Sequence, residues 1–134
     1  MKVSNRGFSL VELVIVIAIM AVLVALLAPQ YIKYVEKSKL ATDEEIIDNI
    51  QHVIAMAVAD ENINYKPLDG LPLDVLENIN RSGKYDDFTS QIMLDLATDD
   101  LSTIKKRLKS KKYKDKRIYV EILSNQQVIV SVYD

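Results

Sequence analysis

One carboxylate at the beginning of a long apolar run is the residue whose position most strongly predicts a function. Glu12 is the only charged residue between Phe8 and Ala28. An ionisable side chain in a segment of membrane length is costly to insert and commonly marks a functional site. The chemistry that a carboxylate supports here is pairing with a cation, on the same helix or on a neighbouring chain. Such pairing fixes the axial register of packed helices, as a buried polar residue does in a coiled coil.

A short basic leader precedes the apolar run, and Lys2 and Arg6 are followed at once by Gly7 and Phe8. In a secretory signal, a cleavage site of small residues follows the apolar segment. Residues 29–31 are Pro, Gln and Tyr and do not form such a site. Glycine lets a protease approach the backbone closely. We therefore expect cleavage between Gly7 and Phe8, which leaves the apolar helix on the mature chain and creates a new amine one helical turn from the carboxylate.

From Lys2 to about Lys39 the chain resembles the type IV pilins and their pseudopilin relatives. The shared pattern is a basic leader that ends in Gly7, then Phe8, then Glu12 as the fifth residue of the mature chain. The resemblance implies a prepilin peptidase that cuts after Gly7 and methylates the amine of Phe8, and a role for Glu12 in subunit assembly. It also implies other copies of the chain, related pilins, an assembly ATPase and its membrane platform as partners.

The apolar run is long enough to cross a bilayer, since its 21 residues span about 30 Å as a helix. Beyond it, apolar residues recur at three- and four-residue steps, which predicts an amphipathic helix. We expect a leader at residues 1–7, a transmembrane and filament-core helix at residues 8–29, and its amphipathic half at residues 30–61. Pro29 removes a backbone hydrogen bond and predicts a kink. The basic leader and the resemblance favour a single-pass protein with a cytoplasmic N-terminus, which later enters an extracellular filament.

Residues 62–134 are expected to complete a small α+β head of the pilin type. Turn residues predict a linker at 62–74, and apolar spacing predicts short helices near 74–80, 88–96 and 101–108. The N-caps expected for the first and third of these helices are Asp74 and either Thr98 or Asp99. Alternation of β-branched residues predicts a hairpin over 117–134 that packs on the long helix. No third strand is predicted.

Charge is distributed unevenly, although the net charge is only −2. Nine basic residues and a single acid lie between Lys105 and Arg117. Four acids, Asp43, Glu44, Glu45 and Asp48, form one acidic cluster. Candidates for contact with an anionic surface are Lys105, Lys106, Arg107, Lys109, Lys111 and Lys112. The candidate partners of this basic stretch are an anionic surface, DNA and the acidic cluster near Asp43 of a neighbouring subunit; alternatively, the stretch is only a solvated face. Membrane lipid is the expected partner of the apolar helix.

Nothing in the sequence favours an enzyme, a metal site or a cofactor. Cysteine is absent and His52 is the only histidine, so a zinc-type ligand set is unsupported. No phosphate-binding or dinucleotide motif occurs. The absence of cysteine and the many Asp, Ile, Lys and Asn residues lean toward a Gram-positive source. We expect a structural subunit of a pilus-like filament; the alternatives are a pseudopilin of a competence or type II secretion system and a non-filamentous membrane-anchored binding module.

Overall fold

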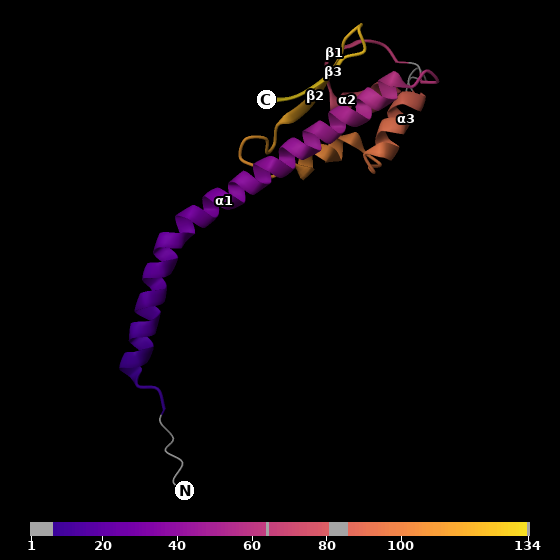
Figure 1. Ribbon diagram of the computed structural model, residues 1–134. Helices are drawn as coiled ribbons and strands as arrows, with labels where there is room; N and C mark the ends of the chain where they lie inside the picture. Colours follow the sequence, from indigo (N-terminus) through magenta and orange to yellow (C-terminus); the bar gives the residue numbers. More distant parts are fainter. Residues whose placement is uncertain (1–6, 64, 81–85, 134) are drawn as a thin grey trace. The chain divides into compact units, whose positions relative to one another are not determined.

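The computed structural model describes residues 7–63, 65–80 and 86–133 (Figure 1). The chain divides into two compact units between Glu36 and Lys37. The elements are α1 (Leu10–Ala59), β1 (Leu68–Pro72), α2 (Leu73–Asn80), α3 (Asp86–Asp95), the 3₁₀ helix η1 (Leu101–Arg107), β2 (Arg117–Ile122) and β3 (Val128–Tyr133). The predicted α+β class is confirmed.

The long N-terminal helix is continuous, as the sequence predicts. α1 has 50 residues and continues through Pro29. It also continues through Thr42, whose hydroxyl donates to the Ser38 carbonyl one turn earlier, at 3.1 Å. The large apolar side chains from Leu10 to Leu27 are 50–80% exposed. Among the described residues, α1 is the helix that is long and apolar enough to cross a membrane.

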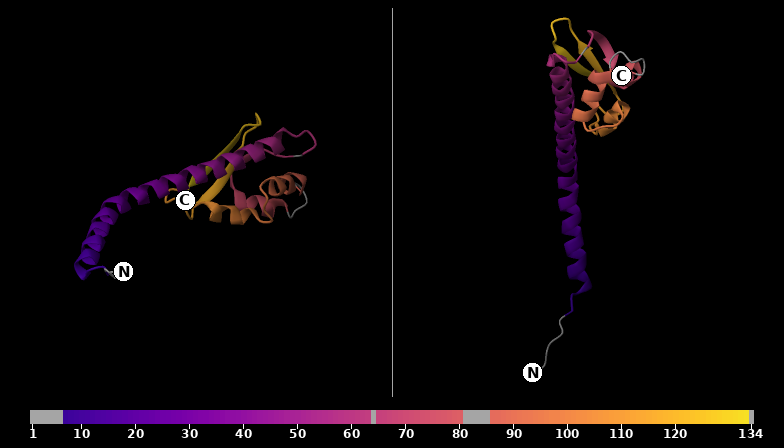
Figure 2. Two further views of the ribbon diagram at one scale, coloured as in Figure 1. Left: turned by 60° about the horizontal axis from the view of Figure 1, so that its bottom comes forward. Right: turned by 90° about the vertical axis from the view of Figure 1, so that its right-hand side faces the viewer.

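The second half of α1 supplies one side of the core of the head. Buried residues of α1 recur at three- and four-residue steps, which places them on one stripe of the helix: Ile50, Val53, Ile54, Ala57 and Val58. The sheet and the short helices lie along this part of α1 (Figures 1 and 2). They complete the core with Leu73, Leu76, Phe88, Ile92, Leu96, Leu101, Ile104, Leu108, Ile118, Val120, Ile122 and Val128.

The predicted hairpin is present and is part of an antiparallel sheet with the order β1-β2-β3. In β2, Ile118, Val120 and Ile122 are buried, because alternate side chains of a strand point to the same face. On the intervening positions, the rings of Tyr119 and Tyr133 stack with centroids 4.2 Å apart. The inward residues of β2 share one core cluster with the stripe on α1, as predicted.

The sheet has a third strand, β1, which the sequence-based prediction did not include; this is its main error. Leu68–Pro72, assigned to a linker, forms β1 and pairs with β2, with Leu71 opposite Val120. Gly70 has a φ of +55°, and the register shifts between Leu68 and Leu71. Glycine adopts this left-handed conformation at little cost, so the turn residues produce an irregular edge strand instead of a loop.

The third short helix also differs from its prediction. It is a 3₁₀ helix, and its N-cap is Asp100, not Thr98 or Asp99. Asp100 has extended backbone angles, so its carboxylate accepts a hydrogen bond from the Ser102 amide at 2.7 Å. The Thr98 hydroxyl instead donates to the Asp100 carbonyl at 2.9 Å, which holds the preceding turn.

Ile50→Ala tests the packing of α1 against the head. The side chain of Ile50 is 1% exposed, so truncation is expected to lower the free energy of unfolding by about 2–4 kcal/mol. The measurement is urea unfolding of residues 30–134, which we expect to be soluble and monomeric. Gln51→Ala, at the exposed neighbouring position, is the control and should change stability by less than about 0.5 kcal/mol. An equally small change for Ile50→Ala would contradict the assigned helix face.

Candidate functional site

Glu12 forms a capping box with Ser9 at the beginning of α1. The Ser9 amide donates to Oε2 of Glu12 at 2.8 Å, and the Glu12 amide donates to the Ser9 hydroxyl oxygen at 3.2 Å. Two amides that lack partners at the helix terminus are therefore satisfied reciprocally. The Ser-x-x-Glu spacing is the sequence signal for this cap, and the sequence-based prediction missed it. Glu12 thus has a local role in addition to any pairing between chains.

The predicted cleavage position is open in the structure. Phe8 is 93% exposed, Gly7 is also exposed, and a Cβ added at Gly7 would meet no atom within 4 Å. Neither residue is part of the helix, which begins at Leu10. The backbone at Gly7 and Phe8 is therefore accessible to a protease. The predicted basic residues Lys2 and Arg6 lie outside the described residues.

Asp43 is a buried carboxylate that joins α1 to the basic stretch. It is 0% exposed, and its Oδ1 and Oδ2 lie 2.9 and 3.0 Å from the amide nitrogen of Lys109. Oδ2 also accepts hydrogen bonds from the amide of Ser110 at 2.7 Å and from its hydroxyl at 2.5 Å. We call this arrangement of Asp43, Lys109 and Ser110 the Asp43 latch. It links residues 66 and 67 positions apart in the sequence.

The environment of Asp43 favours its charged form. Burial alone raises the pKa of a carboxyl group, but the Ser110 hydroxyl, the amides of Lys109 and Ser110 and the charge of Lys109 act together in the opposite direction. Their combined effect places the pKa of Asp43 below its ordinary value. Asp43 is therefore ionised at neutral pH and serves as the acceptor for the loop that carries the basic residues.

The structure separates the six predicted anion-contact residues into groups. Lys105, Lys106 and Lys109 line one hollow of about 520 Å³ together with Lys39 and Lys114, which the prediction missed. We call this the lysine-lined hollow. The other predicted residues have contacts elsewhere. The Arg107 guanidinium donates to the carbonyls of Leu96 and Ala97, both at 3.4 Å.

Part of the acidic cluster contacts the basic stretch within the same chain. Nζ of Lys112 lies 3.6 Å from Oε1 of Glu44 and 4.6 Å from the centroid of the Tyr113 ring. Lys111 also makes an interaction within the chain. Together with the Asp43 latch, these contacts give two members of the acidic cluster partners in their own subunit. A neighbouring subunit's cluster is correspondingly less available to the basic stretch than the sequence suggested.

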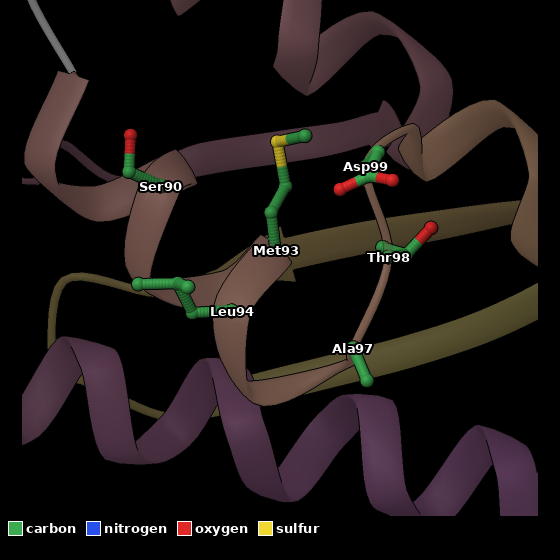
Figure 3. A pocket seen from close by; sticks show the side chains of 6 residues that line it. All are labelled: Ser90, Met93, Leu94, Ala97, Thr98 and Asp99. Carbon is green, nitrogen blue, oxygen red and sulfur yellow. The ribbon is translucent and has the colours of Figure 1, made fainter.

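A second hollow, of about 370 Å³, lies where α3 ends and is lined by Ser90, Met93, Leu94, Ala97, Thr98 and Asp99 (Figure 3). The Thr98 amide donates to the Met93 carbonyl at 3.0 Å and Ala97 has a φ of 48°, a turn typical of a helix C-terminus. The described lining has no nucleophile paired with a base. Within residues 7–63, 65–80 and 86–133, no group of three His, Cys, Asp or Glu side chains is arranged to hold a metal ion.

Comparison with known proteins supports the reading of the N-terminal segment. Residues 2–28 match the family model of the prokaryotic N-terminal methylation motif. Two fimbrial proteins of Dichelobacter nodosus are each 33% identical over 85 residues, which are 63% of this chain and 52% of theirs. The chain thus spans about half the length of the curated relatives it matches. No solved structure matches. These similarities confirm the predicted likeness to type IV pilins.

Proposed function

We propose that this chain, which is similar to the type IV pilins in its N-terminal motif, is a non-enzymatic structural subunit of a type IV pilus-like filament. One observation carries the proposal: the Gly7–Phe8 boundary directly precedes a helical segment whose large apolar side chains are 50–80% exposed. Exposed apolar surface on this scale requires a lipid or protein partner. A cut before the segment retains this surface on the mature protein, as a filament subunit requires.

We propose that the apolar part of α1 has two environments in turn. Before assembly it lies in the bilayer as a single-pass anchor with a cytoplasmic N-terminus. In the filament, outside the cell, the same side chains pack against α1 of other copies and of related pilins. The sequence offers no phosphate-binding motif, so the work of extraction falls to a partner ATPase and its membrane platform.

Pro29 is proposed to let α1 bend when its apolar part moves from the bilayer into the filament. Proline has no amide hydrogen, so the hydrogen bond to the carbonyl four residues earlier is missing within α1. A helix bends most easily where a backbone hydrogen bond is absent. We therefore expect α1 to adjust its curvature at Pro29 when its apolar part moves from lipid to the filament.

Processing gives the direct test. The mature protein, purified from its native host, is expected to begin at Phe8 and to carry a methyl group on the new amine. Mass spectrometry of the N-terminal peptide measures both changes. Gly7→Val is expected to block the cut, because a branched side chain hinders access to the backbone, while membrane insertion is retained. Recovery of residues 1–7 on assembled subunits would contradict the proposal.

The alternatives from the sequence are less favoured. Both relatives named above are fimbrial proteins, which favours a pilus subunit over a pseudopilin of a competence or secretion system. A non-filamentous membrane-anchored module does not require removal of a leader. Electron microscopy of cells with and without the gene distinguishes the two. Deletion of the gene removes surface filaments if the protein is a filament subunit and leaves them unchanged if it is a non-filamentous module.

A further inference from the structure

The lysine-lined hollow concentrates positive charge in a way that the filament role does not require. Five lysines line it against one acid, Asp115: Lys39 from α1, Lys105 and Lys106 from η1, and Lys109 and Lys114 from the loop that follows. Among the described residues, none of these five ammonium groups lies within 4.0 Å of a carboxylate oxygen. Like charges repel at close range, and the Asp43 carboxylate offsets this repulsion at Lys109, so a mobile or bound anion would stabilise the arrangement further.

The hollow is held in shape by backbone contacts. The Asp43 latch fixes the amides of Lys109 and Ser110 against α1, and the carboxylate is completely buried. The side chain of Leu108, the residue before Lys109, is buried in the core cluster. The backbone that carries Lys109 is therefore fixed relative to Lys39 on α1. A fixed cluster loses less conformational freedom on binding than lysines on a mobile tail.

We infer that the lysine-lined hollow docks the head on the anionic phospholipid headgroups of the bilayer that holds the chain before assembly. Charge complementarity points to phosphate groups, since five lysines and one acid line the hollow. Proximity points to the bilayer: Lys39 follows the end of the apolar run by eleven residues on the same helix. The anchor holds the head near the bilayer, so the headgroups are at high effective concentration and even weak lysine–phosphate contacts form.

Two other partners fit the structure less well. The acidic cluster of a second copy is partly engaged, since Asp43 is in the latch and Glu44 pairs with Lys112. For single-stranded nucleic acid, the hollow lacks a stacking platform, because its lining contains no aromatic side chain. The inference rests on the proposed membrane anchorage, and the experiment below tests the anchorage separately.

The test is lysine footprinting of the full chain in vesicles. The chain is reconstituted into phosphatidylcholine vesicles, with or without phosphatidylglycerol, and flotation measures insertion. Acylation followed by mass spectrometry then measures the reactivity of each lysine. Lys39, Lys105, Lys106, Lys109 and Lys114 are expected to react several times more slowly in the vesicles with phosphatidylglycerol, and high salt should remove this protection. The exposed Lys66 should react equally in both.

Two variants of equal charge locate the effect. Lys105→Gln, Lys106→Gln and Lys109→Gln together are expected to abolish protection at Lys39 and Lys114. The matched control is Lys66→Gln with Lys111→Gln and Lys112→Gln, which removes the same charge outside the hollow. In this control, Lys39 and Lys114 should remain protected.

Equal reactivity of the five lysines in both vesicles, with normal flotation, would overturn the docking and leave the anchorage intact. Failure to float with either vesicle would overturn the anchorage and the docking with it. A DNA oligonucleotide that protects these lysines in neutral vesicles, where phosphatidylglycerol gives no protection, would replace the lipid with nucleic acid as the partner.

Discussion

Glu12→Val is expected to reduce filament assembly by at least tenfold while the subunit inserts into the membrane normally. Insertion should become easier, because a charged side chain in a membrane segment is costly, from about 2.5–3.5 kcal/mol at the helix centre to less near its end. Assembly should fail because the variant removes the proposed partner of the new amine on Phe8. A loss of about 1.4 kcal/mol at each subunit contact already lowers association tenfold. The measurement is the yield of sheared filaments from cells that lack the wild-type chain, with membrane-bound subunit determined in parallel.

The capping box makes a second comparison necessary. Glu12 accepts the Ser9 amide through Oε2, so valine removes a cap as well as a charge. Glu12→Gln keeps an acceptor at the same position, since glutamine also completes a capping box, but removes the charge. Ser9→Ala does the reverse. If pairing with an amine drives assembly, Glu12→Gln should fail like Glu12→Val, and Ser9→Ala should assemble. Assembly of Glu12→Gln at wild-type yield would show that the cap suffices and that the pairing role is wrong.

The periodic parts of the chain were predictable because burial imposes them. α1 needs an apolar stripe to cover the head, so Ile50, Val53 and Ala57 indicate both the helix and the face that packs. Strands β2 and β3 alternate for the same reason. β1 lacks such a pattern, since its five residues include Asp69, Gly70 and Pro72. Its position depends on pairing with β2, a long-range contact that local propensities do not encode.

Sequence reasoning could identify the candidate residues that form a local motif. It could not identify those that only the fold brings together. Gly7, Phe8 and Glu12 lie within six residues of one another, and their order alone predicts processing. Asp43 looks in the sequence like one member of an exposed acidic cluster. Only folding brings the amides of Lys109 and Ser110 to it across more than 60 intervening residues. The grouping of Lys39 with the basic stretch follows from that same long-range contact.

Asp43→Asn is expected to destabilise the head, because it weakens the Asp43 latch that joins α1 to the basic stretch. The carboxylate accepts from two amides and a hydroxyl, and hydrogen bonds to charged groups contribute about 1.5–3 kcal/mol each. An asparagine keeps one oxygen but presents a donor to groups that are themselves donors. We expect the free energy of unfolding to fall by about 3–5 kcal/mol at neutral pH, less than the sum of the three because the bonds share one side chain. Asp48→Asn, the same substitution at an exposed position of α1, should have an effect below about 0.5 kcal/mol.

The pH dependence of stability in wild type and Asp43→Asn tests whether the charge of Asp43 is the cause of the destabilisation. The pKa of Asp43 is lower in the folded head than in the unfolded chain, where about 3.9 is typical of aspartate. Its contribution is therefore complete above that value and is lost as the pH falls through the lower, folded value. The difference in unfolding free energy between wild type and Asp43→Asn should be constant from neutral pH to about pH 5 and should shrink below about pH 4. Urea titrations of both proteins across this range measure it. If the difference stayed constant down to the lowest pH, the destabilisation would come from the shape of the side chain and not from the charge that holds the latch.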